Sequence, residues 1–327
     1  MNVLVTGGAG YIGSVVAEEL VRQRHSTLVL DDLSTGHRDA VPALAYLVEG
    51  ALEAPGKLDE ALGVKEIDCV MHLAAKSVVE ESVQHPELYE RANVDAGVRL
   101  LDAMRARGVK RLVFSSSAAV YDPAGPMPLR EDAPARPTNP YGATKLRFER
   151  ELEARAARGE LAYVALRYFN VAGASIDHGE DHRTETHLVP RLLDAARGAR
   201  GPVPIHGSDY DTPDGTAVRD YLHVLDVADA HLRALRHLAE AGPSLTLNLG
   251  SGRGHSVREV IRAVERVTGL EVPVREDARR PGDPPVLIAS SEAARRVLGW
   301  SPEFGDLEMI LGSAWDWRRR YPEGYRE

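Results

Sequence analysis

A glycine-rich loop near the amino terminus constrains the fold of this chain more than any other feature of the sequence. Gly7, Gly10 and Gly13 follow a β-branched run, residues 2–6, and lead into a stretch with helical periodicity. Glycines at this spacing allow a tight turn, a close approach of the backbone to a pyrophosphate, and close packing of the helix on the strand. Asp31 ends the next strand-like run, where a carboxylate can accept both hydroxyls of an adenosine ribose but repels a 2′-phosphate. The loop therefore predicts a dinucleotide site for NAD rather than NADP.

Short β-branched runs alternate with amphipathic helical stretches through the first half of the chain. The strand-like runs are 2–6, 27–31, 69–73, 111–115 and 163–167, and the helical stretches are 11–24, 87–107 and 141–158. Further along, strands are expected at 218–224 and 245–249, and helices at 225–239, 256–268 and 306–320. Strands that alternate with helices at this spacing form βαβ units and a parallel sheet covered on both faces. We predict an α/β fold, a Rossmann-type doubly wound parallel sheet with a smaller, interleaved C-terminal α/β substrate-binding domain.

The predicted domain division follows from the place where this alternation stops. Residues 1–169 form the NAD-binding domain, and residues 217–240 return to it. After Asn170 the chain is crowded with Gly, Pro, His and Asp, which is typical of loops around a site. Residues 170–216 and 241–327 therefore form the predicted nucleotide-sugar-binding domain.

The composition of the chain argues against nucleic acids and membranes as partners. The formal net charge of the 327 residues is −9, which argues against a protein whose main task is binding nucleic acid. The same charge means that local cations must gather wherever an anion binds. Cys69 is the single cysteine, and neither a signal peptide nor a membrane-spanning stretch is visible. We expect a cytoplasmic protein with no membrane partner.

Three histidines fall close together in one polar loop. His178, His182 and His187 have no cysteine partners there, and the chain has no cysteine-rich zinc motif. We therefore expect no metal.

A tyrosine and a lysine point to acid–base chemistry. Tyr141 and Lys145 are four residues apart on a predicted helix, so both side chains emerge on one face. A tyrosine serves as a base only if its pKa falls from about 10 toward neutrality, which requires about 4 kcal/mol of preferential stabilisation of the phenolate. A nearby ammonium and a positively charged nicotinamide ring can supply it. Ser117 ends a serine run at the carboxyl end of a predicted strand, where it can bond the hydroxyl that Tyr141 deprotonates.

Seven stretches of the sequence carry a family resemblance. They are residues 5–13, 31–37, 114–121, 141–145, 166–170, 218–224 and 279–283. Through them the chain resembles the extended short-chain dehydrogenase/reductase family and, within it, the UDP-glucose 4-epimerases, over nearly its whole length. The stretches around the serine run, Arg219 and Arg280 are the more specific ones.

The resemblance implies a NAD-dependent isomerase that epimerises C4 of a UDP-sugar, UDP-glucose and UDP-galactose above all. In this family C4 is oxidised transiently, the 4-keto sugar rotates, and the hydride returns to its other face. A homodimer built through residues 87–107 and 141–158 is also implied.

The resemblance also implies roles for individual residues. The implied catalytic residues are Ser117, Tyr141 and Lys145. The implied cofactor-binding residues are Gly7, Gly10, Tyr11, Ile12, Gly13, Asp31, Asp32, Lys76, Asn93, Ser115, Tyr141, Lys145 and Tyr168. The implied substrate-binding residues are Lys76, Ser117, Tyr141, Asn170, His187, Leu188, Arg219, Arg280 and Asp283, the two arginines on the phosphates and Asp283 on the uridine ribose.

Five positions depart from the family pattern, among them Asp32, which replaces a common asparagine, and Asp122, which replaces a common glycine. His187 stands where several relatives carry an asparagine that touches the phosphates, and Ala51 stands where an aspartate usually bonds adenine. Leu287 falls at the position whose bulk limits the sugar pocket in some relatives, and it is smaller than the tyrosine of strict glucose/galactose enzymes. N-acetylated sugars are therefore a hypothesis for the substrate.

Other functions stay open at this point. One is a different enzyme of the same family, a 4-epimerase of UDP-N-acetylglucosamine or of a UDP-pentose or uronate. A dehydratase would need an acid/base carboxylate pair directly after the strand serine, where Ala118 and Ala119 stand. A non-catalytic NAD-sensing module keeps the glycine loop but commonly loses the tyrosine or the lysine, and both are present here.

Overall fold

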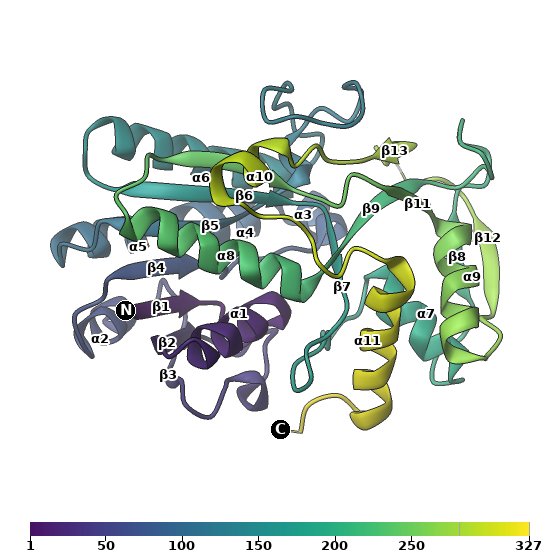
Figure 1. The fold of residues 1–327 in the computed structure, drawn as a ribbon, viewed down its shortest axis with the longest axis horizontal. Helices are drawn as coiled ribbons and strands as arrows, with labels where there is room; N and C mark the ends of the chain where they lie inside the picture. Colours follow the sequence, from purple (N-terminus) through teal and green to yellow (C-terminus); the bar gives the residue numbers. More distant parts are fainter. Residues whose placement is uncertain (281, 327) are drawn as a thin grey trace.

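The computed structural model describes residues 1–280 and 282–326. Seven parallel strands form its main sheet in the order β10-β6-β5-β4-β1-β2-β3 (Figure 1). The strands are β1 (Asn2–Thr6), β2 (Ser26–Asp31), β3 (Tyr46–Glu49), β4 (Cys69–His72), β5 (Arg111–Ser117), β6 (Ala162–Tyr168) and β10 (Leu245–Leu249). The central strands β1, β4 and β5 are almost entirely buried, as expected for a parallel sheet covered on both faces.

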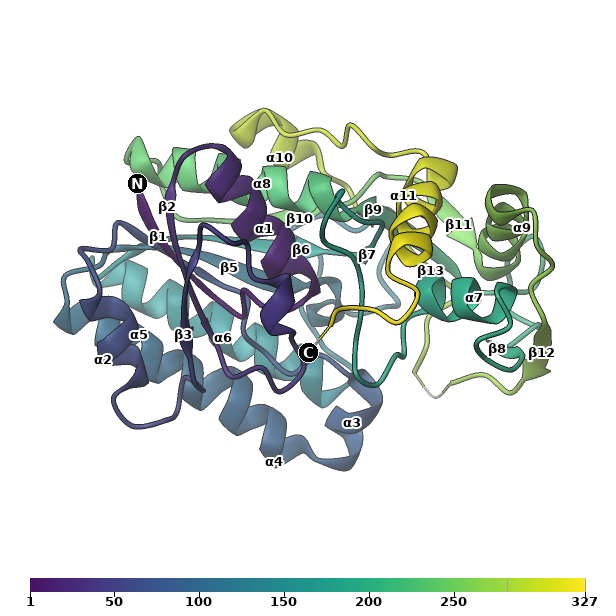
Figure 2. The ribbon, with the colours of Figure 1, turned by 90° about the horizontal axis from the view of Figure 1, so that it is seen from below.

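Helices cover the two faces of this sheet because successive strand side chains point in opposite directions. Val3 and Val5 pack in one core with α1 (Tyr11–Arg22) and α8 (Val224–Ala239), whereas Leu4 packs in a second core with α5 (Ala96–Ala106) and α6 (Pro140–Ala157). Figure 2 shows the two helical layers on either side of the sheet. The remaining helices of this half are η1 (Arg38–Ala40), α2 (Lys57–Gly63), α3 (Val79–Gln84), α4 (Pro86–Tyr89), η2 (Glu90–Asp95), η3 (Ala118–Val120) and α10 (Glu292–Leu298).

A smaller α/β region lies beside the carboxyl ends of the main sheet (Figure 1). Its four-stranded sheet runs β11-β9-β13, with β7 also paired to β9, and a separate two-stranded sheet joins β12 to β8. The elements are β7 (Asn170–Ala172), α7 (Leu188–Ala196), β8 (Val203–His206), β9 (Val218–His223), β11 (Gly254–Ser256), α9 (Val257–Thr268), β12 (Val274–Asp277), β13 (Val286–Leu287) and α11 (Leu307–Arg320). The apolar faces of α7, α9 and α11 share a third core.

One strand changes the predicted domain boundary. The sequence predicts the strand at 245–249 but assigns it to the second domain, whereas β10 pairs in parallel with β6 as the seventh strand of the main sheet. The stretch 217–240 is divided between the two regions, because β9 joins the small sheet and α8 covers the main sheet. A strand pattern specifies which residues are extended but not which strand they pair with. The rest of the predicted domain division stays a prediction.

One predicted helix is also interrupted. The stretch 87–107 is predicted as a single helix, but the structure divides it into α4, the π-helical η2 and α5. The wider π-turn brings Asn93 toward the segment after β4, where it bonds the backbone of Lys76. Within the described residues, none of the helices combines the length and the apolarity needed to cross a bilayer.

Candidate active site

The glycine loop lies where the strand order of the main sheet reverses. The chain adds β2 and β3 on one side of β1 and β4, β5 and β6 on the other, which leaves a crevice at the carboxyl ends of β1 and β4. Gly7 has a left-handed φ of 74°, and a Cβ on it would lie 2.5 Å from the amide nitrogen of Ala74. A Cβ on Gly13 would lie 2.0 Å from the carbonyl oxygen of Gly7. A Cβ on Gly10 would meet no atom closer than 3.5 Å, so protein packing alone does not require this glycine and it leaves room for a ligand.

Asp31 ends β2 beside this loop, as predicted. Its buried carboxylate accepts the backbone N–H groups of Ala9 and Leu33, both at 2.9 Å. Burial raises the pKa of Asp31, and the two backbone hydrogen bonds oppose that rise. The neighbouring Asp32 is exposed and accepts the backbone N–H of Ser34 at 2.9 Å. The acid that the sequence assigns to the ribose therefore also holds the glycine loop in place.

Tyr11 and Ile12 begin α1, where the first backbone N–H groups of a helix are available to an anion. The Tyr11 hydroxyl donates to the carbonyl of Gly173 at 2.7 Å, which ties the glycine loop to the loop that follows β7.

Asn93 is buried and joins three segments. Its Oδ1 accepts the backbone N–H of Lys76 at 2.8 Å, and its Nδ2 donates to the Lys76 carbonyl at 3.0 Å and to Oγ1 of Thr144 at 3.1 Å. The amide thereby fixes the segment after β4 against α6, which positions Lys76 at the edge of the crevice.

The start of α6 places Tyr141 against the end of β5. Asn139 caps the helix by accepting the N–H of Gly142 at 2.8 Å, and Pro140 occupies the first helical position. A Cβ on Gly142 would lie 2.1 Å from the carbonyl oxygen of Ala119. The sequence analysis missed this glycine, which lets α6 approach the turn after Ser117.

Ser117, Tyr141 and Lys145 are brought together as predicted. The Lys145 ammonium is buried, donates to the carbonyl of Ser115 at 2.8 Å, and lies 5.8 Å from the centroid of the Tyr141 ring. Burial lowers the pKa of Lys145 to about 7, although the charge of Glu149 opposes the fall. Burial raises the pKa of Tyr141, and its hydrogen bond with Ser117 opposes the rise. The protein by itself therefore does not acidify Tyr141, so the positive charge of a bound nicotinamide ring becomes essential to the predicted chemistry.

Tyr168 and Ser115, both predicted to contact the cofactor, lie side by side at the crevice. Their hydroxyls are hydrogen-bonded to each other at the ends of β6 and β5. Burial raises the pKa of Tyr168, and the nearby Tyr141 raises it further. Tyr168 therefore stays protonated and can act only as a neutral donor or acceptor.

A buried ion pair beneath the site was not found from the sequence. The carboxylate of Glu149 on α6 accepts a hydrogen bond from Nε of Arg167 on β6 at 2.9 Å and another from the hydroxyl of Ser116 on β5 at 2.5 Å. Arg167 also donates to the Tyr121 hydroxyl at 2.9 Å. These bonds fix α6, β5 and β6 relative to one another, and Lys145 lies one helical turn before Glu149 on α6.

Several of the residues predicted to bind the substrate lie on or beside the small sheet. Arg219 on β9 is mostly buried, and its Nη2 lies 3.0 Å from Oδ1 of Asp283. Leu287 on β13 is paired in register with Arg219. Asn170 begins β7 and is exposed, and Arg280 is also exposed. The structure therefore brings together the predicted arginine, the predicted ribose ligand and the residue expected to limit the sugar pocket.

Arg191 on α7 is a further cation that the sequence analysis missed. Its Nε is buried and has no hydrogen-bond partner in the described part of the chain. Burial lowers the pKa of Arg191, and the charges of Arg200 and Arg280 lower it further. Like charges gathered in this way are typical of an anion site. Arg191 lies outside every family motif, one turn after His187 and Leu188, so no sequence signal identified it.

Residues 3–250 match the NAD dependent epimerase/dehydratase family. The chain belongs to this family. Its full-length relatives include the UDP-glucose 4-epimerase of Lactobacillus helveticus, which is 46% identical over 329 residues that cover 100% of both proteins. A crystal structure of the UDP-glucose 4-epimerase of Brucella ovis in complex with NAD is 46% identical, with a TM-score of 0.93 over 96% of this chain and 97% of that one. The Bifidobacterium longum enzyme in complex with NAD+ and UDP is 34% identical, with a TM-score of 0.94 over 99% of this chain and 100% of that one.

These comparisons confirm the predicted family and the predicted Rossmann-type fold, and they make this a member of a NAD-dependent family. The catalytic, cofactor and substrate roles of the individual residues stay predictions.

Proposed function

We propose that this chain is a NAD-dependent UDP-sugar 4-epimerase that interconverts UDP-glucose and UDP-galactose. One observation supports this function above the others. Lys145 bonds the end of β5, two strands from β1 and its glycine loop, and Tyr141 lies one turn before it on α6. On the small region, Arg219 lies on β9 beside Asp283, and Arg191 on α7 lies near the charge of Arg280. An acid–base group beside a dinucleotide loop and a set of guanidinium groups suit a substrate that has a reacting hydroxyl and a diphosphate.

The residues around the crevice fit NAD. Gly10 leaves space at the start of α1, where helix N–H groups can hold the pyrophosphate, and Asp31 and Asp32 stand at the end of β2 for the adenosine ribose. We propose Lys76, Lys145 and Tyr168 for the nicotinamide end, because all three border the carboxyl ends of β4, β5 and β6. When bound there, NAD would supply the acceptor for the hydride of C4 and the source from which the hydride returns.

Tyr141 is the proposed base. In the forward half-reaction its phenolate takes the proton of the 4-hydroxyl while the hydride leaves C4, and in the return half-reaction it gives the proton back to the C4 oxygen. Ser117 orients the hydroxyl through its hydrogen bond to Tyr141. The Lys145 ammonium favours the phenolate by opposite charge. With a pKa of about 7, Lys145 carries that charge on only about half of the molecules at neutral pH, so the nicotinamide ring would have to supply the rest.

The arginines are proposed to hold the diphosphate while the 4-keto sugar rotates. Guanidinium groups bind phosphate oxygens in pairs, which suits Arg219 and Arg280. Arg191 adds a third cation, and His187 can donate from its second ring nitrogen. Asp283, held 3.0 Å from Arg219, remains near enough to bond the uridine ribose. Anchoring the diphosphate leaves the sugar free to present either face to the cofactor.

The breadth of the sugar pocket is a second part of the proposal. Leu287 lies next to Arg219 in the sheet register, so its side chain belongs to the substrate side. A leucine at that place leaves more room than a tyrosine, which favours acceptance of UDP-N-acetylglucosamine as a slower substrate. Equal exclusion of this sugar by the natural protein and by Leu287→Gly would count against it.

A homodimer and a cytoplasmic location also remain part of the proposal. The proposed contact uses α5 and α6, which lie on the same face of the main sheet. Light scattering of the purified protein distinguishes a dimer from a monomer.

A panel of UDP-sugars, mixed with purified protein and no added cofactor, tests the proposed function. We expect UDP-glucose and UDP-galactose to interconvert fastest, without net formation of NADH. Binding of NAD with no turnover of any sugar would favour a sensing module instead, and loss of water from the sugar would favour a dehydratase.

A further inference from the structure

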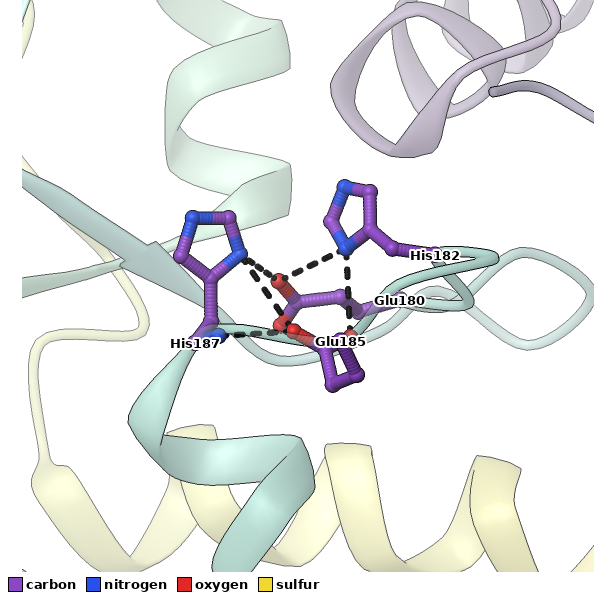
Figure 3. A group of neighbouring side chains, drawn as sticks. All are labelled: Glu180, His182, Glu185 and His187. Carbon is purple, nitrogen blue, oxygen red and sulfur yellow. Dashed lines mark hydrogen bonds and ion pairs between the residues drawn. The ribbon is translucent and has the colours of Figure 1, made fainter. Parts of the chain in front are cut away.

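Four side chains of one loop converge just before α7. Glu180, His182, Glu185 and His187 point toward a common centre (Figure 3), and one ligand atom from each lies within 4.8 Å of the other three. Nδ1 of His182 lies 3.1 Å from Oε2 of Glu185 and 3.5 Å from Oε1 of Glu180. Nδ1 of His187 lies 2.5 Å from Oε1 of Glu180 and 3.8 Å from Oε1 of Glu185.

These separations suit a tetrahedral metal ion. With metal–ligand bonds of about 2.1 Å, the donor atoms of a tetrahedral site are about 3.4 Å apart. The distances from Nδ1 of His182 to Oε2 of Glu185 and to Oε1 of Glu180 lie near that value. The contact between His187 and Glu180 must open by about 1 Å. The carboxylate of Glu185 must also turn, because it contacts His182 through Oε2 and His187 through Oε1. We propose that Glu180, His182, Glu185 and His187 bind one divalent transition-metal ion of the zinc class, through Nδ1 of each imidazole and one oxygen of each carboxylate.

The charges of the cluster also favour a bound cation. The side chains of Glu180 and Glu185 are only 7% and 9% exposed. The ion pairs that these two carboxylates make within the described part of the chain are with His182 and His187. Two buried carboxylates side by side are costly unless cations compensate them. A divalent ion with two neutral imidazoles gives a site with no net charge, and two protonated imidazoles are the competing way to balance the same carboxylates.

The donor set selects the kind of metal. Imidazole nitrogen with carboxylate oxygen, four donors in all, suits zinc and its neighbours in the first transition row. Mg²⁺ prefers six oxygen ligands in octahedral geometry and is expected to bind poorly. The histidines of this loop have no cysteine partners and predict no metal from the sequence, but the fold places two glutamates among them.

The backbone around the cluster is already anchored at both ends. Arg318 of α11 donates to the carbonyl of Glu180 at 3.3 Å, and Arg200 donates to the carbonyl of Glu185 at 3.3 Å. The ring of Tyr11 lies 6.3 Å from the ring of His182. A metal ion here would therefore brace the loop between β7 and α7, which contacts Tyr11 after the glycine loop, so its role is structural.

The proposed metal also fixes the tautomer of His187. Coordination through Nδ1 leaves the proton on Nε2, which points away from the cluster in Figure 3. If the proposed function holds, that N–H is the donor available to the substrate diphosphate. The metal site itself does not depend on this step.

Metal binding can be measured directly on the intact protein without substrate. The protein is treated with a chelator, desalted, and titrated with Zn²⁺ by calorimetry, with Mg²⁺ as the comparison ion. We expect one Zn²⁺ per chain and no matching Mg²⁺ signal. His182→Asn and Glu185→Gln should each weaken Zn²⁺ binding by more than about 100-fold, because loss of a direct ligand exceeds the 10- to 100-fold cost of losing a supporting hydrogen bond.

A matched control separates this site from adventitious surface binding. His85 is exposed and its side chain does not cap α4, so His85→Asn should bind Zn²⁺ as the natural protein does. X-ray absorption of the zinc-loaded natural protein should show a four-coordinate nitrogen and oxygen shell, which keeps the test valid if a variant fails to fold. The proposal is wrong if the natural protein takes up no stoichiometric Zn²⁺, or if folded His182→Asn and Glu185→Gln bind it as His85→Asn does. Failure of UDP-sugar turnover would overturn the proposed function and leave the metal result unchanged.

Discussion

The carboxyl edge of the main sheet and the loop-rich region opposite it build their sites in different ways. At the sheet edge, Ser117 ends a strand, while Tyr141 and Lys145 lie one turn apart on α6. In the opposite region, Arg219 and Arg191 come from a strand and a helix that are brought together only by the small core. In the proposed mechanism the regular half supplies fixed positions for bond chemistry, whereas the irregular half supplies the charge that holds an ion.

The electrostatics of the two regions differ in the same sense. At the sheet edge, burial dominates and lowers the pKa of Lys145 to about 7. In the loop cluster, burial lowers the pKa of His187, but the charge and hydrogen bond of Glu180 outweigh it and raise that pKa to about 9. Desolvation prepares groups that exchange protons, whereas pairing stabilises the charged form of His187 in the absence of a metal ion. The proposed metal ion must therefore displace that proton when it binds. The following substitutions and pH dependence test whether the two regions differ in this way.

Removing the Tyr141 hydroxyl should have the largest effect. Tyr141→Phe is expected to lower kcat by about 10²–10⁴-fold, the usual range for loss of a positioned general base, while KM changes little. Tyr163→Phe removes the same hydroxyl at the amino end of β6, far from the carboxyl edge, and should keep its activity. Steady-state rates with UDP-galactose check both variants. Similar losses in the two would place the chemistry elsewhere.

The buried ammonium of Lys145 should make stability depend on pH. Its pKa falls from an ordinary 10.5 to about 7 on folding, so the folded state disfavours the charged form. The resulting cost is complete below pH 7 and fades as the pH rises toward 10.5. Between pH 7 and 9 the free energy of unfolding of the natural protein, freed of dinucleotide, should therefore rise by roughly 2 to 3 kcal/mol relative to Lys145→Met. Urea unfolding measures it, and parallel pH profiles would contradict a depressed lysine.

Substitutions at Gly10 and Gly13 should affect NAD binding and folding stability to different degrees. A Cβ on Gly10 meets nothing within 3.5 Å in the protein, so Gly10→Ala should change the free energy of unfolding by no more than about 1 kcal/mol. It should nevertheless weaken NAD binding at least tenfold, or about 1.4 kcal/mol, because the Cβ occupies space needed by the pyrophosphate. Gly13→Ala forces a 2.0 Å contact with Gly7 and should disturb the loop itself. Undiminished NAD binding by Gly10→Ala would argue against this placement of the pyrophosphate.

Arg191 should show the smallest and most selective effect. Arg191→Met is expected to raise KM for UDP-galactose about tenfold and to leave kcat nearly unchanged, because the cation binds the diphosphate in every state of the reaction. Arg197→Met is the matched control, since Arg197 ends the same helix in an ion pair with Asp194. A fall in kcat for Arg191→Met would mean that the loop-rich half takes part in the chemistry.

The sheet edge could be predicted from sequence because its residues lie on regular elements. The strand at 2–6, the helix around Tyr141 and the pairing of Tyr141 with Lys145 follow from periodicity and spacing, and the structure contains all three. The predicted strand at 245–249 has the right bounds but the wrong neighbours, because pairing with β6 depends on residues far away in the sequence.

The opposite region could be predicted only in part. Arg219 lies in a family motif. In contrast, Arg191 and the two glutamates of the proposed metal cluster become candidate site residues only because the fold brings them close to other charged side chains. Glu180 becomes a candidate ligand because the loop turns its carboxylate toward His187. Short strands such as β13 are also held by pairing with neighbours rather than by their own pattern. A charged site built from loop residues is therefore harder to predict from sequence than one built on helices and strands.

The fate of the hydrogen on C4 tests the central claim most directly. UDP-galactose carrying deuterium at C4 is incubated with the purified protein in ordinary water, and the UDP-glucose formed is analysed by mass spectrometry and NMR. A hydride that leaves C4 and returns to it predicts that the deuterium stays at C4 with no exchange into water. Loss of the label to solvent would contradict the account, because it would show that C4 is inverted by proton transfer instead.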